Sequence, residues 1–452
     1  MKRLDIFLLC CLLAVSGASQ TLSLDSCLHI ASRNNLLLRN ARLDVEKAKD
    51  VRQQALSNYF PRVSGQAVGY YALHPLIEIG AQDLINGVNN ENARQNLQTL
   101  YDDYGQSLGL DNLFSFFRRG FSVGATAIQP LCLGGQIVNG NRLARIGVEA
   151  AELEVEIKER DLLLSVEESY WLVIALQDKQ QTLDAVLALL DTLSGNVDAA
   201  VSAGLATTND RLQLRLRQNE IEAKQLQLNS GIRLAKQALC QSLGINYSDS
   251  LMLSDDISDP GTTYPFTDST YQPEPRPEQR LLALQVKAAN LKKDIEIGKA
   301  MPQLMVGGTY AYNHLLFDRG SGNGMLFATL QVPLTQWWES SFRIKEQRRA
   351  REQAENEQKH YTQLMELELM QAGQEAETAE KQAALCQTAI DAAEENLHLA
   401  TANYGAGLCP VSDLLQAQTL YMQAKNDLTD ARIRLRIACR RRAALQRGLS
   451  AD

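Results

Sequence analysis

The chain has 452 residues, of which 22% are charged and 6% aromatic, and its formal net charge is −8. This length accommodates two or three domains, and the negative charge argues against a general nucleic-acid-binding protein. There are only 11 prolines, and long tracts of Ala, Leu, Glu, Gln, Lys and Arg predict a mostly helical fold.

The N-terminus has the pattern of a secretory signal peptide. Lys2 and Arg3 precede an apolar run, and small residues follow it. We expect residues 1–18 to be removed and the mature chain to leave the cytoplasm. Acylation is the alternative, but Cys10 and Cys11 lie inside the apolar run, whereas an acylation signal has small residues beside its cysteine.

No later apolar run reaches the roughly twenty residues that a membrane-spanning helix needs. A mature chain that spans a membrane must therefore do so with strands. Six cysteines remain after cleavage, without the CxxC spacing of metal sites or disulfide frameworks. We interpret these residues as isolated thiols: Cys27, Cys132, Cys240, Cys386, Cys409 and Cys439.

A first helical pattern ends near Pro61, where the side chains begin to alternate with a period of two. Segments 61–72 and 120–131 predict two strands, each about as long as a transmembrane strand. We place Pro61 and Pro130 at helix–strand junctions, where a residue without a backbone N–H is tolerated. The polar stretch 73–119 is expected to be a long loop.

Residues 136–203 predict a helix about 100 Å long with a heptad seam of apolar residues. Gly204 suits the left-handed position that ends a helix. Thr207 and Asp210 then form a capping pair for a return helix, which is expected to reach Leu243. The sequence therefore predicts a long helical hairpin.

The second half repeats this order. After a Pro-, Asp-, Ser- and Thr-rich linker over 244–280, strands are expected at 302–314 and 324–334. Pro302 and Pro333 are placed at their junctions with helices.

A second long helical run leads to a tip near Gly407 and to a return helix that ends at about Arg447. When the two tips are aligned from Ala203 and Ala406, six of eleven positions are identical. The chain therefore contains an internal repeat, with a first copy over 19–243 and a second over 281–452.

Four strands leave two unpaired edges, which hydrocarbon cannot satisfy, so several copies must close a barrel. Two copies would give eight strands and an interior filled with side chains. Three copies would give twelve strands and room for water.

In the order and duplication of these motifs, the chain resembles the TolC-like outer-membrane efflux and secretion channels. The resemblance rests on the segment LSLDSCLHIASRNN, the duplicated helix–Pro–strand–loop–strand–Pro–helix order and AGLxxxxDxLQ at both tips. It implies a mainly α fold with a β-barrel part. Three chains would form a 12-stranded outer-membrane barrel, with four strands per chain, that continues into a periplasmic α-helical barrel of coiled-coil hairpins. The linker would form an equatorial region.

The resemblance also implies a function and partners. A homotrimer in outer-membrane lipid, extending into the periplasm, would passively conduct substrates to the outside. It would work with a periplasmic adaptor, also called a membrane fusion protein, and an inner-membrane transporter. The assembly would be a tripartite efflux pump or a type I secretion system, and no cofactor is implied.

At the tips, Asp413 and its first-repeat equivalent Asp210 match acidic residues that narrow the closed entrance and favour cations. Gln416 stands where the family often has a second acid, which puts a double acidic ring in doubt. Both aspartates also suit a role as helix caps alone. Four further residues match positions associated with adaptor docking: Gly204, Leu205, Gly407 and Leu408.

Other protein classes fit parts of the pattern. A periplasmic coiled-coil adaptor or scaffold would share the signal and the hairpins, but it typically has one hairpin in a β-rich chain. An envelope hydrolase with a helical stalk needs a compact catalytic constellation. The histidines are scattered, and no catalytic or metal-ligand spacing stands out, so we expect no enzyme. The Arg-rich segment 432–447 is expected to be a solvated or acid-paired helix face, not a nucleic-acid site.

Overall fold

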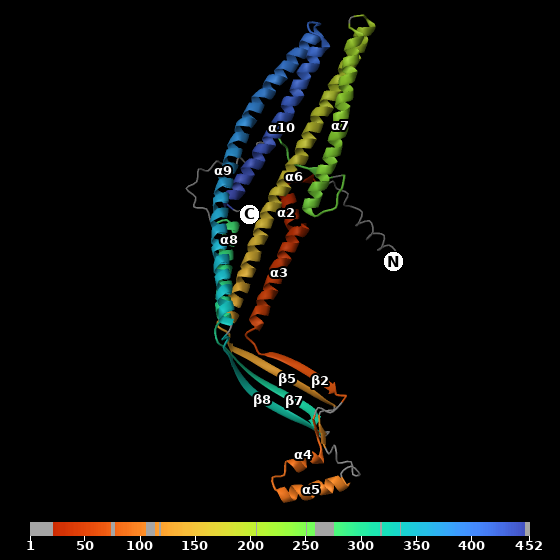
Figure 1. Cartoon of the computed structure of the whole chain (residues 1–452). Coiled ribbons are helices and arrows are strands. Elements are labelled where there is room, and N and C mark those ends of the chain that lie inside the picture. The colour runs from red at the N-terminus through yellow and green to blue at the C-terminus, as the bar shows by residue number, and fades with distance from the viewer. Residues whose placement is uncertain are drawn as a thin grey trace, which may run out of the picture. The chain divides into compact units, whose positions relative to one another are not determined.

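The computed structural model describes residues 21–73, 77–104, 114–116, 119–204, 206–249, 251–257, 275–316, 319–334 and 336–447. The predicted signal peptide lies outside these residues. The chain divides into two compact units (Figure 1). The helical unit comprises Met1–Ala48, Val148–Val286 and Ala354–Asp452, and the strand unit comprises Lys49–Gly147 and Lys287–Gln353.

A four-stranded antiparallel sheet is the centre of the strand unit. Its strands, in spatial order, are β2 (Arg62–Tyr71), β5 (Arg119–Cys132), β7 (Gln303–Leu316) and β8 (Arg319–Gln331). Each half of the chain contributes two neighbouring strands, and the halves meet at the β5–β7 pair, where Thr126 is opposite Thr309.

Two details of the sheet differ from the sequence prediction. β8 begins at Arg319 and ends at Gln331, earlier than the expected 324–334, because β7 and β8 form a hairpin paired as far as Leu316 and Arg319. Pro130 lies within β5 and not at its junction with a helix. The strand tolerates it because pairing with β2 stops at Ile128 and the register with β7 shifts just after Pro130.

The stretch expected to be a long loop contains regular structure. It holds β3 (Ile77–Ile79), α4 (Ala81–Asn86), α5 (Glu91–Tyr104) and β4 (Phe114–Phe116), and β3 pairs antiparallel with β4. The carboxylate of Asp83 accepts a hydrogen bond from the Gly80 N–H at 2.9 Å, which caps the start of α4. Gln82 and Gln98 bond their amides to each other across the two helices.

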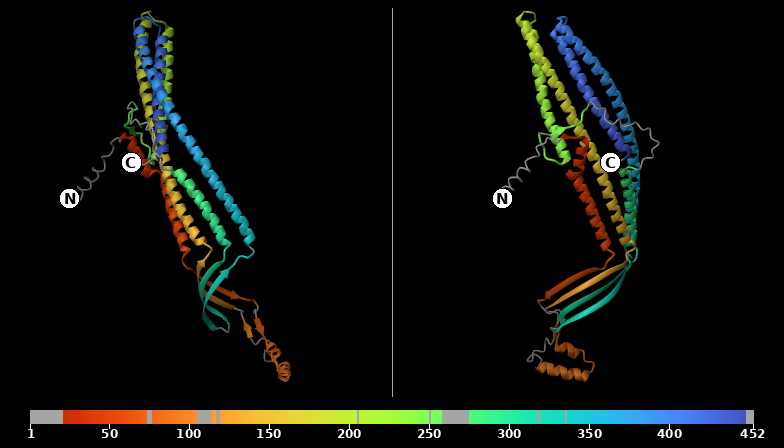
Figure 2. Two further views of the ribbon diagram at one scale, coloured as in Figure 1. Left: turned by 90° about the vertical axis from the view of Figure 1, so that its left-hand side faces the viewer. Right: turned by 180° about the vertical axis from the view of Figure 1, so that it is seen from behind.

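Helices account for most of the remaining chain (Figure 2). In chain order they are α2 (Leu24–Asn34), α3 (Leu36–Ser57), α6 (Gln136–Ser202), α7 (Thr208–Leu243), α8 (Pro277–Lys299), α9 (Gln336–Gly405) and α10 (Val411–Arg447). Within the helical unit, α6 with α7 and α9 with α10 form two antiparallel hairpins whose tips lie at the same end (Figure 2). A short parallel pair joins β1 (Thr21–Leu22) to β6 (Met252–Leu253).

The heptad seam of α6 is buried, as the sequence predicted. Leu183, Leu190 and Val197 pack with α7 and α10 in one apolar cluster, which Leu214 and Leu414 join from those helices. A seam of this kind draws its stability from apolar area removed from water. The two hairpins of one chain are therefore held together by a shared core.

Among the described residues, α6 is also long and apolar enough, by length and composition alone, to cross a membrane. The sequence predicted no apolar run of about twenty residues after residues 1–18, and α6 meets the present criterion by its average composition and not by such a run. The apolar residues of the α6 seam pack against neighbouring helices. This packing accounts for apolar residues in the helix without a membrane.

A second apolar cluster surrounds α2, the first described helix. Cys27 of α2 packs with Tyr170 of α6 and Leu239 of α7, and the Tyr170 hydroxyl donates to the Leu22 carbonyl at 3.1 Å. Burial raises the pKa of the Cys27 thiol to about 12, with Asp255 adding to the shift. This thiol is therefore un-ionised and unreactive at neutral pH.

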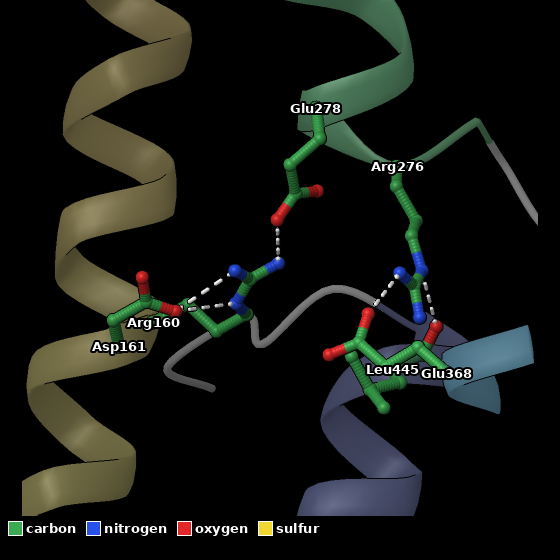
Figure 3. Close-up of polar contacts among 6 residues, drawn as sticks. All are labelled: Arg160, Asp161, Arg276, Glu278, Glu368 and Leu445. Atoms are coloured by element: carbon green, nitrogen blue, oxygen red, sulfur yellow. Dashed lines mark hydrogen bonds and ion pairs between the residues drawn. The ribbon is translucent and has the colours of Figure 1, made fainter. Parts of the chain in front are cut away.

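Two largely buried arginines hold the start of α8 in the helical unit (Figure 3). The Arg160 guanidinium of α6 lies between Asp161 and Glu278. Burial alone would lower the pKa of Arg160, but the two carboxylates raise it overall. Arg276 donates to the Leu445 carbonyl of α10 at 3.0 Å and pairs with Glu368 of α9 at 3.1 Å. These contacts join four helices at the point where the linker ends.

The seam predicts a stability difference between two leucine truncations. Leu190 is fully buried, whereas Leu226 on α7 is 71% exposed. We expect Leu190→Ala to lower the free energy of unfolding by about 2–5 kcal/mol, because it leaves a cavity. Leu226→Ala should change it by less than about 0.5 kcal/mol. Guanidinium titration followed by circular dichroism measures both, and equal small effects would contradict the packed seam.

Candidate functional site

The first hairpin tip begins where α6 ends. Gly204 has φ +73°, and its N–H donates to the Val201 carbonyl at 3.1 Å. A side chain at this glycine would meet no atom within 4 Å, so the left-handed backbone, and not crowding, favours glycine here. Leu205 lies outside the described residues.

Asp210 caps the helix that follows this tip. Its carboxylate accepts from the Thr207 N–H at 2.9 Å and from the Thr207 hydroxyl at 2.8 Å. In return, the Asp210 N–H donates to the Thr207 hydroxyl oxygen at 3.2 Å. The predicted capping pair is confirmed, and the Asp210 carboxylate is held by local hydrogen bonds.

The second tip ends α9 in the same way. Gly407 has φ +71°, and the Leu408 N–H donates to the Asn403 carbonyl at 2.8 Å, which completes a Schellman stop. A leucine at this position of a Schellman stop can supply an apolar contact to the helix end. Leu408 is instead 76% exposed, so the tip presents an apolar side chain to its surroundings.

Asp413 differs from Asp210 although the two are equivalent in the repeat. It is the third residue of α10, and its counterpart to Thr207 is Pro410, which has no N–H to donate. Asp413 is exposed, and its carboxylate accepts from the Ser412 hydroxyl at 3.2 Å. Gln416, one turn later on the same helix, is exposed as well.

Close to the tips, the structure brings residues of the two hairpins together that the sequence did not single out. Arg217 of α7 donates to the Thr419 hydroxyl of α10 at 2.8 Å. Tyr404 of α9 packs into the apolar cluster, and burial followed by the charge of Asp210 raises the pKa of its hydroxyl. Neither contact has a signal in the sequence, because the partners are about 200 positions apart.

Further from the tips, the two hairpins are joined by charged side chains. Lys179 pairs with Asp430 at 2.7 Å, and Glu167 pairs with Arg440 at 2.9 Å. The Arg436 guanidinium lies 4.1 Å from the centre of the Trp171 ring, a cation–π contact. The expectation that the Arg-rich end is partly acid-paired is confirmed for Arg440.

In the strand unit, the sheet has two faces of different chemistry, because antiparallel register places paired residues on the same face. One face is mostly apolar, with Val63, Gly65, Ala67, Gly69, Tyr71, Phe121, Val123, Ala125, Ala127, Val306, Gly308, Tyr310, Tyr312, Gly324, Leu326, Ala328 and Leu330, and with Gln129 and His314 as polar members. The other face is polar over Ser64, Gln66, Ser122, Thr126, Thr309, Asn313, Ser321, Asn323 and Thr329, with Arg62 at its helical end. It also carries Val68, Tyr70, Gly120, Gly124, Ile128, Met305, Gly307, Ala311, Met325 and Phe327.

The apolar face is solvent-accessible in the single chain and carries aromatic side chains towards one end. Leu326, near the middle of β8, is 90% exposed. Phe121 contacts Tyr312 with ring centres 6.1 Å apart and stacks on His314 at 5.3 Å. At the helical end, the Trp337 indole donates to the Ala300 carbonyl at 3.2 Å. An apolar band bounded by aromatic residues is typical of strands in contact with lipid.

Comparison with known protein families identifies the family to which this chain belongs. Residues 27–245 and 274–445 match the family described as outer membrane efflux protein. The chain belongs to this family. The matched segments include both halves of the repeat, and membership assigns this efflux protein to the outer membrane, from which it extends into the periplasm.

Solved structures of several channels share the fold. The CmeC outer membrane channel of Campylobacter jejuni is 14% identical, with a TM-score of 0.74 over 94% of this chain and 85% of that one. VceC of Vibrio cholerae is 15% identical, with a TM-score of 0.71 over 94% and 97%. The open-state MtrE channel of Neisseria gonorrhoeae is 16% identical, with a TM-score of 0.73 over 95% and 90%. A search of curated protein sequences finds no match.

These comparisons confirm the expected mainly α fold with a β part and an internal repeat. Within the efflux protein, Pro61, Pro302 and Pro333 lie between helices and strands. The described cysteines are all free thiols. In the described ranges, no group of three or more His, Cys, Asp or Glu side chains is arranged to hold a metal ion.

The two tip aspartates should differ in their effect on local stability. Asp210→Ala removes the acceptor of the Thr207 N–H, which costs about 1 kcal/mol, and should speed amide exchange in the first turn of α7 roughly fivefold. Asp413→Ala removes no capping bond and should change only the smaller helix-dipole contribution in α10. Hydrogen–deuterium exchange measures both, and equal effects would contradict the difference in capping.

Proposed function

We propose that this protein is the passive exit channel of a tripartite efflux assembly, acting as a homotrimer in the outer membrane. The observation that carries the proposal is the four-stranded sheet, which is apolar on one face and polar on the other. One face suits lipid and the other suits a water-filled lumen.

The edges of the sheet support the trimer. Within the described chain, β2 and β8 each have one neighbour in this sheet, so each leaves a row of backbone groups unpaired. Hydrocarbon cannot satisfy such groups, and pairing β2 of one copy with β8 of the next closes the sheet. Three copies give twelve strands, enough for an aqueous interior.

The polar face has the properties of an unselective wall. The Ser122 hydroxyl donates to the Asn313 side chain at 2.7 Å, and the Thr126 and Thr309 hydroxyls are 3.0 Å apart. These uncharged groups favour neither cations nor anions. A charge preference would therefore arise elsewhere along the channel.

The hairpin tips are the proposed entrance. Asp413 is exposed and free of a capping role, so three copies would place three carboxylates around the opening and favour cations. Asp210, engaged with Thr207, would support the tip structure. Gly204, Gly407 and the exposed Leu408 would meet a periplasmic adaptor, and an inner-membrane transporter would supply the energy.

The lipid-facing assignment predicts opposite tolerance at neighbouring positions of β8. Leu326 is on the apolar face and Met325 on the polar face, and both are exposed in the single chain. Leu326→Arg should cost about 2–4 kcal/mol in the bilayer and reduce the amount of folded protein in outer-membrane fractions. Met325→Arg should insert at close to the wild-type level. The reverse order would contradict the face assignment.

The entrance assignment predicts a change in ion preference. In planar bilayers, the wild-type protein should give discrete, cation-preferring conductance steps, and the mass of the same sample should be that of a trimer. Asp413→Ala should lower the cation preference and alter the conductance, because it removes charge from the entrance. Asp210→Ala is the matched control and should change the preference less. A monomeric, silent protein would favour the periplasmic scaffold instead.

A further inference from the structure

Each of the four strands of the sheet is connected to one helix. α3 leads into β2, α6 follows β5, α8 leads into β7 and α9 follows β8. Asn141 of α6 donates to the Ala55 carbonyl of α3 at 3.0 Å, and Trp337 of α9 donates to the Ala300 carbonyl beyond α8 at 3.2 Å. Within this unit, α3 and α9 are therefore the outer helices of the layer, as β2 and β8 are the outer strands.

The outer side of α9 carries an aromatic and cationic stripe. Trp338, Phe342, Lys345 and Arg349 are spaced four, three and four residues apart, so they share one helix face. All four are exposed, and the Lys345 ammonium lies 5.3 Å from the centre of the Phe342 ring. The half-buried Ile344 marks the side of α9 that packs within the chain.

The outer side of α3 carries a polar stripe with one acid, Asp50, and one base, Lys47, which is exposed and lies three residues before it. Asp50, Gln54 and Ser57 share one face and are exposed, whereas Ala48 and Ala55 on the opposite side are half-buried. Asp50 makes no ion pair or side-chain hydrogen bond with the described residues of its own chain, and the same holds for Arg349. The α9 stripe therefore presents two cations, and the α3 stripe presents a carboxylate, Asp50, that has no ion pair with the described residues of its own chain.

The two stripes lie at matching distances from the sheet. Residues 58–61 separate α3 from β2, and residues 332–335 separate β8 from α9, so both junctions have the same length. Asp50 is seven residues before the end of α3, and Lys345 is nine residues after the start of α9. At about 1.5 Å per residue, this difference is roughly 3 Å along the helices, within the reach of a lysine side chain.

We propose that the stripe of α9 docks on the stripe of α3 from a second copy of this chain, with Asp50 of one protomer paired to Lys345 and Arg349 of its neighbour. Trp338 and Phe342 cover the polar stripe beside this pair and remove apolar area from water. The inference rests on the proposed trimer and names the contacts that continue the β2–β8 closure into the helical layer.

Charge reversal and its compensation test the pairing. Lys345→Glu with Arg349→Glu should lower the fraction of trimer that survives heating in detergent about threefold, as should Asp50→Lys, because each places like charges together. Combining all three substitutions should restore most of that fraction. Arg343→Glu is the control, because this exposed residue lies on a different face of α9, where it pairs with Glu339 of the same helix.

Cross-linking tests the proximity directly. In a chain with Cys132→Ser, Asp50→Cys combined with Lys345→Cys should give dimer and trimer bands with a short bis-maleimide, and neither single substitution should do so. A wild-type protein that is monomeric and silent in bilayers would overturn the proposed function itself. A conducting trimer without a cross-link, and with no response to charge reversal, would overturn only this interface.

Discussion

Unpaired backbone groups at a sheet edge are the constraint on which the rest of this structure depends. Each unsatisfied N–H or C=O in hydrocarbon costs several kcal/mol, so a four-stranded sheet with two open edges cannot remain alone in a bilayer. The chain reaches four strands by joining two copies of a two-stranded unit at the β5–β7 pair. In the proposed trimer, the remaining edges are closed by the same kind of antiparallel pairing, repeated around an axis.

In the strand unit, the order of the helices follows the order of the strands. Each strand of the sheet continues into one helix across a short junction, so the number and order of helical segments in the strand unit follow those of the strands. A close approach of backbones makes one junction possible: a side chain at Gly134 would meet the Gly298 carbonyl oxygen at 2.3 Å. In the helical unit, the two hairpins share one apolar core near the tips, and charged pairs such as Lys179 with Asp430 continue the contact away from it.

The sequence predicted the features that local chemistry determines. The capping pair of Thr207 and Asp210 is confirmed because its partners are three residues apart, and the seam through Leu190 is confirmed because a heptad repeat is visible in one helix. The contacts of Arg160 with Glu278 and of Arg276 with Glu368 were not predicted, because their partners are distant in sequence and meet only after packing. The helices within 73–119 were missed because their polar composition resembles that of a loop, and β8 was displaced because the alternation gave no clear start.

The repeat also explains how two equivalent tips can hold different roles. Both need a glycine with positive φ, and Gly204 and Gly407 retain it because the reversal requires it. The residue before the return helix is not under the same constraint, since proline, with its fixed φ, is also compatible with the start of a helix. Where threonine is present, its N–H binds the following aspartate; where Pro410 is present, no such N–H exists, and the Asp413 carboxylate remains available to solvent. One change of capping residue is thus sufficient to separate a carboxylate held by a capping hydrogen bond from one exposed to solvent.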